Sequence, residues 1–167
     1  MATTIAIVSD THMPKGKRTL PPECELICAA ADLIVHGGDL SDGTVLGRFE
    51  AMGPPVVAIH GNVDSAELRR TLPERQVIEI EEARIGLIHD AGPKVGRLNR
   101  MRKGFPGCDA VIFGHSHLPL HETDPDTGFQ IFNPGSPTER RRSPFKSMGR
   151  AIVDGSKVDF ELIDLGL

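Results

Sequence analysis

The stretch Ala110-Val111-Ile112-Phe113-Gly114-His115-Ser116-His117 joins a short apolar run to two histidines. An apolar run of this length is typical of a buried strand. Gly114 carries no Cβ, so it frees the backbone for a sharp exit from that strand. The two imidazoles, two residues apart, can face one pocket, which makes them either a metal site or two ordinary turn histidines. The ends of the other predicted strands bear on this choice.

Four further strand-like runs, at residues 3–8, 32–35, 56–59 and 84–88, also end in polar side chains. Each of these side chains, taken alone, is an ordinary turn residue. In sheet-based α/β folds, however, ligands gather beyond the carboxyl ends of the strands. A single zinc ion needs about four ligands, so two carboxylates, an amide and four imidazoles suit a pair of transition-metal ions. The candidate metal ligands are Asp10, His12, Asp39, Asn62, His89, His115 and His117.

The remaining pattern alternates helices and strands. We expect helices at about residues 21–31, 42–52, 65–72 and 95–103, and strands at 76–81, 129–132, 150–153 and 157–163. Residues 13–20 have a basic, loop-like composition. Asp64 lies three residues before Glu67, which favours a capping role at the third helix over a metal-binding role. The basic residues of the helix at 95–103 are expected to form a solvated face.

Length and composition limit the class of protein. The 167 residues predict one domain, residues 1–167, with a core that needs no disulfides. Cys24, Cys28 and Cys108 lack zinc-site spacing, and we expect reduced thiols in a cytoplasmic protein. No signal-peptide or membrane-span pattern is expected. A net charge of -4 and the lack of Trp and Tyr disfavour nucleic-acid binding.

The ordered motifs Asp10-Thr11-His12, Gly37-Gly38-Asp39, Gly61-Asn62, His89 and Gly114-His115-Ser116-His117 resemble those of the calcineurin-like metallophosphoesterase superfamily. Asn133-Pro134-Gly135-Ser136 resembles the small, single-domain phosphodiesterase branch of that superfamily. The resemblance spans about residues 3 to 160. It implies an α/β fold, a four-layer α-β-β-α sandwich in which two mixed sheets face each other with helices outside.

The resemblance also implies a dinuclear metal centre in which Asp39 bridges the two ions. One ion would take Asp10, His12, Asp39 and His117, and the other would take Asp39, Asn62, His89 and His115. Asp39, Asn62 and His89 would be the catalytic residues. The ions would be divalent transition metals, manganese first, with iron, zinc or nickel as alternatives. They would activate a hydroxide that hydrolyses a small phosphate ester, most readily a phosphodiester, without a phosphoenzyme.

Two positions depart from the family pattern. Many members carry a histidine directly after the metal-binding Asn, but this chain has Val63, which cannot protonate a leaving oxygen. General acid catalysis supplies about 10²–10⁴-fold, so we expect poor activity on alkyl monoesters and better activity on diesters with acidic leaving groups. His60 or His36 could act as the acid, or either could be a packing residue. Asp90 replaces a frequent Gly, and it could narrow the pocket, repel an anionic substrate or orient a ligand histidine.

The run Arg140-Arg141-Arg142 is either a solvated loop or a substrate clamp, in which Arg140 and Arg141 bind the phosphate through their planar guanidinium groups. Two other functions are compatible with the family. One is a protein-interaction scaffold that keeps the fold with little catalysis, although every expected ligand position is filled here. The other is a nuclease. We expect no membrane partner, and the sequence leaves a homo-oligomer open.

Overall fold

The computed structural model describes residues 2–13 and 18–167. Within these residues the strands are β1 (Ala2–Val8), β2 (Leu33–His36), β3 (Val56–Ala58), β4 (Arg75–Ile80), β5 (Ala83–Ile88), β6 (Ala110–Ile112), β7 (Leu120–Thr123), β8 (Gln130–Asn133), β9 (Lys146–Asp154) and β10 (Lys157–Gly166). The helices are α1 (Pro22–Ala30), α2 (Gly43–Glu50), α3 (Ala66–Thr71) and α4 (Arg97–Gly104). Part of the expected basic loop at 13–20, residues 14–17, lies outside the described residues.

The strands form two mixed five-stranded sheets, ordered β10-β9-β1-β2-β3 and β4-β5-β6-β8-β7. In the first sheet β1, β2 and β3 run parallel, and β9 pairs antiparallel with both β1 and β10. In the second sheet β5, β6 and β8 run parallel, and β4 and β7 are antiparallel edges. The strands that carry the candidate ligands therefore end at the same edge of each sheet.

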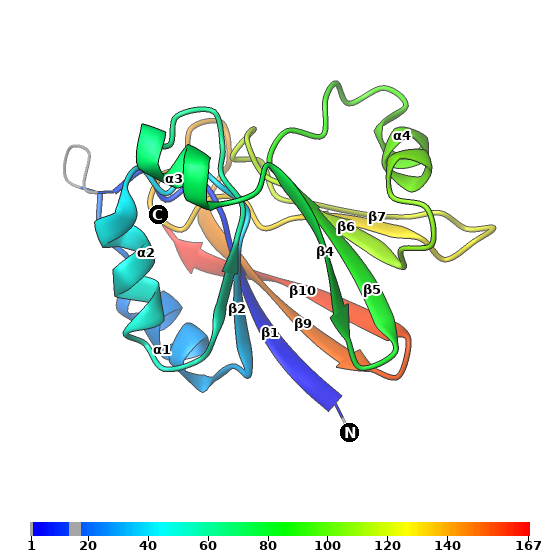
Figure 1. Cartoon of the computed structure of the whole chain (residues 1–167), viewed down its shortest axis with the longest axis horizontal. Helices are drawn as coiled ribbons and strands as arrows, with labels where there is room; N and C mark the ends of the chain where they lie inside the picture. Colours follow the sequence, from blue (N-terminus) through cyan, green and yellow to red (C-terminus); the bar gives the residue numbers. More distant parts are fainter. Residues whose placement is uncertain (1, 14–17) are drawn as a thin grey trace.

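The two sheets face each other and helices cover their outer faces, which gives four layers (Figure 1). Three apolar clusters fill the spaces between these layers. The largest fills the space between the sheets, where Ile5 and Ile7 of β1 meet Ile85 and Leu87 of β5. A second cluster packs α1, α2 and α3 against the outer face of the first sheet. A third packs α4 against the outer face of the second sheet. The expected α-β-β-α sandwich is confirmed.

The expected elements are found, and the strands differ in three places: β7, the start of β9, and the end of β10, which reaches Gly166 rather than residue 163. β7 (Leu120–Thr123) was not expected, because it is a short edge strand that begins directly after Pro119. β9 begins at Lys146 rather than residue 150. Its first half contains Ser147 and Gly149, residue types that rarely indicate a strand. Gly149 is needed there because the ring of Phe132 lies where a Cβ would project.

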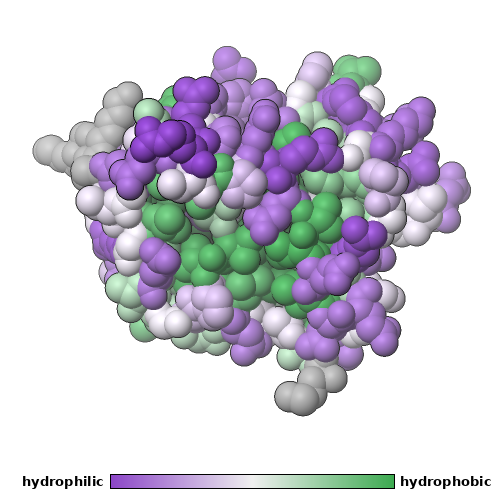
Figure 2. Space-filling model, viewed as in Figure 1, coloured by the Kyte–Doolittle hydropathy of each residue, from purple (hydrophilic) through white to green (hydrophobic). Residues whose placement is uncertain are grey.

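The face seen in Figure 1 exposes part of the inter-sheet core. Figure 2 shows an apolar band across the centre of this face, flanked by hydrophilic side chains, over the region where Figure 1 draws β1, β2 and β4. Val57 and Ile80 are partly buried against the inter-sheet cluster. Among residues 2–13 and 18–167, no helix has the length and apolar character that crossing a bilayer requires.

Candidate metal centre

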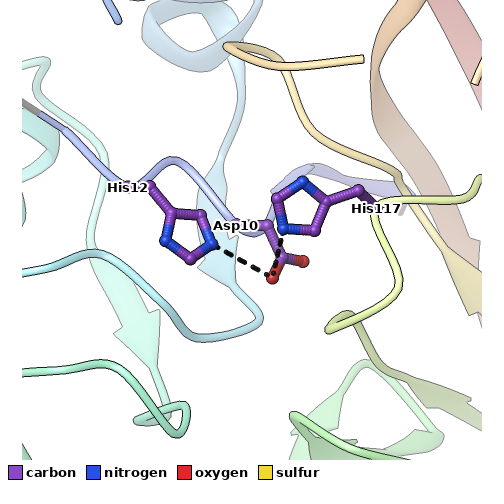
Figure 3. A group of neighbouring side chains, drawn as sticks. All are labelled: Asp10, His12 and His117. Carbon is purple, nitrogen blue, oxygen red and sulfur yellow. Dashed lines mark ion pairs between the residues drawn. The ribbon is translucent and has the colours of Figure 1, made fainter. Parts of the chain in front are cut away.

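Asp10, His12 and His117 form a buried cluster, here called the closed triad (Figure 3). Asp10 and His12 lie in the loop after β1, and His117 lies in the loop after β6. Both imidazole Nε2 atoms point at one carboxylate oxygen, Asp10 Oδ1, at 3.8 Å from His12 and 3.5 Å from His117. The two rings stack with centroids 5.0 Å apart. All three side chains are at most 9% exposed.

Hydrogen bonds aim the Asp10 carboxylate into this cluster. Asp10 Oδ2 accepts hydrogen bonds from the Ser9 hydroxyl at 2.7 Å and from the His115 backbone N–H at 3.0 Å. Asp10 Oδ1 and His12 Nε2 are buried and have no hydrogen-bond partner. Burial favours the protonated carboxyl, but the imidazoles of His12, His89 and His117 outweigh it, and the pKa of Asp10 is lowered. Buried atoms left unpaired in this way are expensive unless a ligand satisfies them.

Asp39, His89 and His115 form a second cluster, here called the open triad. Asp39 follows β2, His89 follows β5 directly, and His115 follows β6. Asp39 Oδ2 lies 3.0 Å from His89 Nε2 and 3.5 Å from His12 Nε2 of the closed triad. Asp39 therefore faces histidines of both triads. The side chain of His115 is 46% exposed, so this triad is open to solvent on one side.

The open triad is oriented by backbone groups. Asp39 Oδ1 accepts a hydrogen bond from the Val63 N–H, which leaves Oδ2 facing the imidazoles. His89 Nδ1 lies 2.7 Å from the Gly37 carbonyl oxygen, an acceptor, so Nδ1 carries a proton. Burial opposes the charged ring, but Asp39 and Asp10 outweigh it and raise the pKa of His89 to about 9. A cation at His89 Nε2 must therefore displace a proton.

Several of these residues have a strained backbone. Asp10, His12, Asp39, His115 and His117 all have positive φ angles, between 46° and 75°. The left-handed conformation costs an L-residue about 1–2 kcal/mol, and Asp and His tolerate it better than most. Gly114 was expected to make the sharp exit from β6, but the left-handed residues are the two histidines after it. Gly114 is required instead because a Cβ would lie 2.1 Å from Ser9 Oγ.

Asp64 joins the loops after β2 and β3, and the expectation that it caps a helix is wrong. Its carboxylate accepts hydrogen bonds from the N–H groups of Gly61 at 2.7 Å, Asp39 at 3.0 Å and Ser41 at 2.9 Å. Ser65 caps α3 by accepting from Leu68 N–H. The carboxylate was available to these three donors because the loops are adjacent in space, which sequence spacing does not reveal.

Asn133, the last residue of β8, and the loop that follows it support the backbone around the closed triad. Asn133 Nδ2 donates to the Gly114 carbonyl at 3.1 Å, and Ser136 Oγ donates to the Asp10 carbonyl at 2.9 Å. Thr138 Oγ1 donates to the Thr11 carbonyl at 2.8 Å. The Asn-Pro-Gly-Ser segment was interpreted from sequence as a turn with a family resemblance. In fact the side chains of Asn133 and Ser136 hydrogen-bond to backbone carbonyls, and so hold in place the loops that contain the candidate ligands.

His36 is a packing residue. It is fully buried, its Nδ1 accepts a hydrogen bond from Gly38 N–H, and its Nε2 lies 3.1 Å from Thr11 Oγ1. Burial lowers the pKa of His36 to about 4, so the ring is neutral. With both ring nitrogens engaged in the interior, His36 does not act as an acid on a substrate.

Comparison with known proteins identifies the family. Residues 3–156 match the model of the calcineurin-like phosphoesterase superfamily domain. The chain belongs to the calcineurin-like phosphoesterase superfamily. A probable metallophosphoesterase of Methanothermobacter thermautotrophicus is 35% identical over 164 residues, covering 97% of this chain and 92% of the relative.

Solved structures share the fold of this superfamily member. Vacuolar protein sorting 29 of Cryptosporidium parvum superposes with a TM-score of 0.80 at 20% identity, covering 99% of both chains. Vps29 of Entamoeba histolytica, solved in complex with Zn²⁺, gives a TM-score of 0.75 at 21% identity, covering 98% of this chain and 99% of that chain. At this identity the likeness establishes the fold alone.

The metal ions that the superfamily implies fit the residues present. Buried Asp10 Oδ1, His12 Nε2 and His89 Nε2 lack hydrogen-bond partners and converge from two loops, those after β1 and β5. Imidazole and carboxylate donors in this mixture are typical ligands of divalent transition metals. The structure thus gathers six of the seven candidate ligands into two triads: Asp10, His12 and His117, and Asp39, His89 and His115.

The seventh candidate, Asn62, is exposed beside the open triad. It lines a pocket of about 280 Å³ together with His60, Arg69, Glu74, His89 and Asp90. His60, one of the two candidate acids, therefore lies on the wall of this pocket. Asp90 forms part of the pocket wall, and its Oδ2 lies 3.9 Å from His115 Nε2.

The two candidate substrate-binding arginines, Arg140 and Arg141, make different contacts. Arg141 Nε lies 3.5 Å from Glu139 Oε1, and Glu139 in turn contacts His117, so Arg141 borders the closed triad. Arg140 instead bonds the Pro144 carbonyl.

The helix at 95–103 was expected to have a solvated basic face, but this is wrong for two of its residues. Arg97 and Arg100 bind carbonyls of residues 91–95 and so hold the loop that follows His89.

Proposed function

We propose that this protein is a phosphodiesterase that hydrolyses a small phosphate ester with two divalent transition-metal ions. One observation carries the proposal. Unpaired buried atoms of Asp10, His12 and His89 converge on a single space that Asp39 also faces. The match to the superfamily model and to a probable metallophosphoesterase supports the same reaction class.

The ligand set follows the two triads. The closed triad with Asp39 would hold one ion, and the open triad with Asn62 would hold the other. Asp39 would be the ligand shared by both ions, because Val63 N–H occupies its Oδ1 while Oδ2 faces histidines of both triads. When bound, a pair of divalent ions would lower the pKa of a water molecule and offset charge on the phosphoryl oxygens. Manganese is the first ion to test, with iron, zinc and nickel as alternatives.

The chain itself orients the donors and receives the substrate. Gly37 fixes the tautomer of His89 by accepting the Nδ1 proton, and Ser9 directs Asp10 Oδ1 into the site. The pocket beside His89 would receive the leaving group, with His60 on its wall. Arg141 would bind a phosphoryl oxygen from the side of the closed triad. The free cysteines are typical of a reducing compartment, so we place the reaction in the cytoplasm.

The dependence of turnover on the leaving group tests the proposal. Val63 fills the position that carries an acid in many relatives, so the reaction should depend on leaving groups that need no protonation. With manganese added, an aryl phosphodiester should turn over about 10²–10⁴-fold faster than an alkyl monoester. A chelator should abolish both activities. Faster turnover of the alkyl monoester would contradict the phosphodiesterase assignment.

The alternative is a protein-interaction role with little catalysis, because members of this fold include vacuolar protein sorting 29. The unpaired buried donors argue against it, since a scaffold gains nothing from keeping them. If the protein binds manganese at neither triad and hydrolyses no phosphate ester, including single-stranded nucleic acid, the scaffold role is favoured. Turnover of nucleic acid alone would instead favour a nuclease.

A further inference from the structure

Glu139 and His117 place two unpaired buried atoms opposite each other. Glu139 lies in the loop after β8, and its Oε2 is 3.6 Å from Nδ1 of His117. Neither atom has a hydrogen-bond partner, although both are buried. Nothing in the sequence connects these positions, because the glutamate lies in a loop that the sequence indicates only as polar.

The tautomer of His117 explains what this contact could do. Its Nε2 faces Asp10 Oδ1 at 3.5 Å inside the closed triad. If the Nε2 lone pair binds a cation, the one proton of the neutral ring must lie on Nδ1. A buried N–H without an acceptor destabilises the state that contains it. Glu139 Oε2 is placed to accept that proton, and a shift of a few tenths of an ångström completes the hydrogen bond.

Two arginines hold the carboxylate in the required form. Arg18 contacts Glu139 Oε1 at 2.8 Å and Arg141 contacts the same oxygen at 3.5 Å, which leaves Oε2 for His117. Burial favours the protonated acid, but Arg18 and Arg141 outweigh it and lower the pKa of Glu139. The Glu139 N–H donates to Ser136 Oγ, whose hydroxyl donates to the Asp10 carbonyl. The acceptor is therefore tied to the same loop as the triad.

We propose that Glu139 is a positioning residue that accepts the Nδ1 proton of His117 and so presents Nε2 to the ion of the closed triad. This rests on the proposed function, because it requires a metal there. Carboxylates that orient ligand histidines in this way typically strengthen metal binding about 10–100-fold. Glu139 touches neither substrate nor ion in this arrangement and acts only through the ring.

The test uses the full chain loaded with zinc, which is diamagnetic, and measures binding without turnover. Nitrogen-15 NMR reports which His117 nitrogen carries the proton, and chelator competition gives the zinc affinity. Glu139→Met removes the acceptor and should weaken zinc binding at the closed triad about 10–100-fold. Glu139→Gln keeps an accepting oxygen and should lie between wild type and Glu139→Met. Arg18→Met breaks the ion pair but keeps the carboxylate, so affinity should fall at most about fivefold.

The outcomes separate this inference from the proposed function. A protonated Nδ1 on His117 in the zinc-loaded wild type, with the graded loss of affinity, supports the inference. Unchanged affinity in Glu139→Met, an equal loss in Arg18→Met, or zinc on Nδ1 overturns the inference alone. The NMR result on wild type decides the matter if Glu139→Met does not fold. Failure of the wild type to bind zinc at either triad overturns the proposed function as well.

Discussion

The closed triad and the open triad use the same donor types, one aspartate and two histidines each, but they differ in exposure. His117 of the closed triad is 1% exposed, whereas His115 of the open triad is 46% exposed. The closed triad is supported by the segment 133–138, at the end of β8 and in the loop after it, and by Glu139. The open triad borders the pocket that Asn62 and His60 line.

This difference assigns separate tasks to two similar clusters. In the proposed function, enclosure would keep water from competing for the closed triad, so fixed donors would hold an ion there. Exposure would let a substrate approach the open triad through the pocket. Asp39 joins them, since its Oδ2 lies 3.5 Å from His12 and 3.0 Å from His89. The following variants test how far the two triads differ, beginning with the largest expected effect.

Removing the shared carboxylate should disable both triads together. Asp39→Asn keeps the shape of the side chain and removes the negative charge between the two ions. We expect loss of both ions and a fall in kcat on the order of 10³-fold, the size of effect that follows loss of electrostatic stabilisation at a reacting phosphate. Metal analysis and kinetics measure this. Retention of one tightly bound ion would show that Asp39 does not serve both.

Removing one histidine from each triad should separate them. His12→Ala removes a buried imidazole donor that water cannot readily replace. Metal binding at the closed triad should therefore weaken more than about 100-fold, beyond the 10–100-fold range for residues that only orient a ligand. His115→Ala exposes the position to water, which can take its place, and the loss should stay below about 100-fold. Metal titration of the two variants gives the comparison. Equal losses would break the distinction between closed and open triads.

Arg141, which borders the closed triad, is expected to bind the substrate phosphate. Arg141→Ala should raise KM about 10–100-fold, because a charged hydrogen bond to phosphate contributes roughly 1.5–3 kcal/mol. Arg140→Ala is the matched control, since Arg140 bonds the Pro144 carbonyl, and its KM should stay unchanged. Metal content is measured in both, because Arg141 also contacts Glu139. Equal KM values in the two variants would remove Arg141 as the clamp.

The smallest effect concerns backbone strain at the exposed histidine. His115 has a φ of 75°, which glycine adopts without penalty. His115→Gly should therefore be more stable than His115→Ala by about 1 kcal/mol, measured by urea unfolding of the metal-free protein. Ser116 does not share the positive φ, so the same pair of substitutions there should favour alanine. The same sign at both positions would contradict the assignment of strain to His115.

The sequence predicted the candidate site better than its supports. Asp10, Asp39, His89 and His115 each follow an apolar run, and the carboxyl ends of parallel strands meet at one edge, so strand order alone brings them close. Asp64 and Glu139 gave no such signal. Their partners belong to loops distant in sequence, and a carboxylate at a loop position fits capping, solvation or support equally well before the fold is known.

Some elements of the fold also escaped prediction for physical reasons. β7 is a short edge strand whose pairing with β8 outweighs weak local preference. Arg97 and Arg100 were expected to be solvated on charge pattern, but they bind backbone carbonyls of the loop before α4. The positive φ values of His115 and His117 depend on the loops around them, so sequence placed the turn at Gly114 instead.

The most direct test of the two-triad centre is anomalous X-ray diffraction from crystals of the manganese-loaded protein. The account predicts two manganese peaks, one at Asp10, His12 and His117 and the other at Asp39, His89 and His115, with the Asp39 carboxylate between them. A single peak, or two peaks with Asp39 turned away from both, would contradict it.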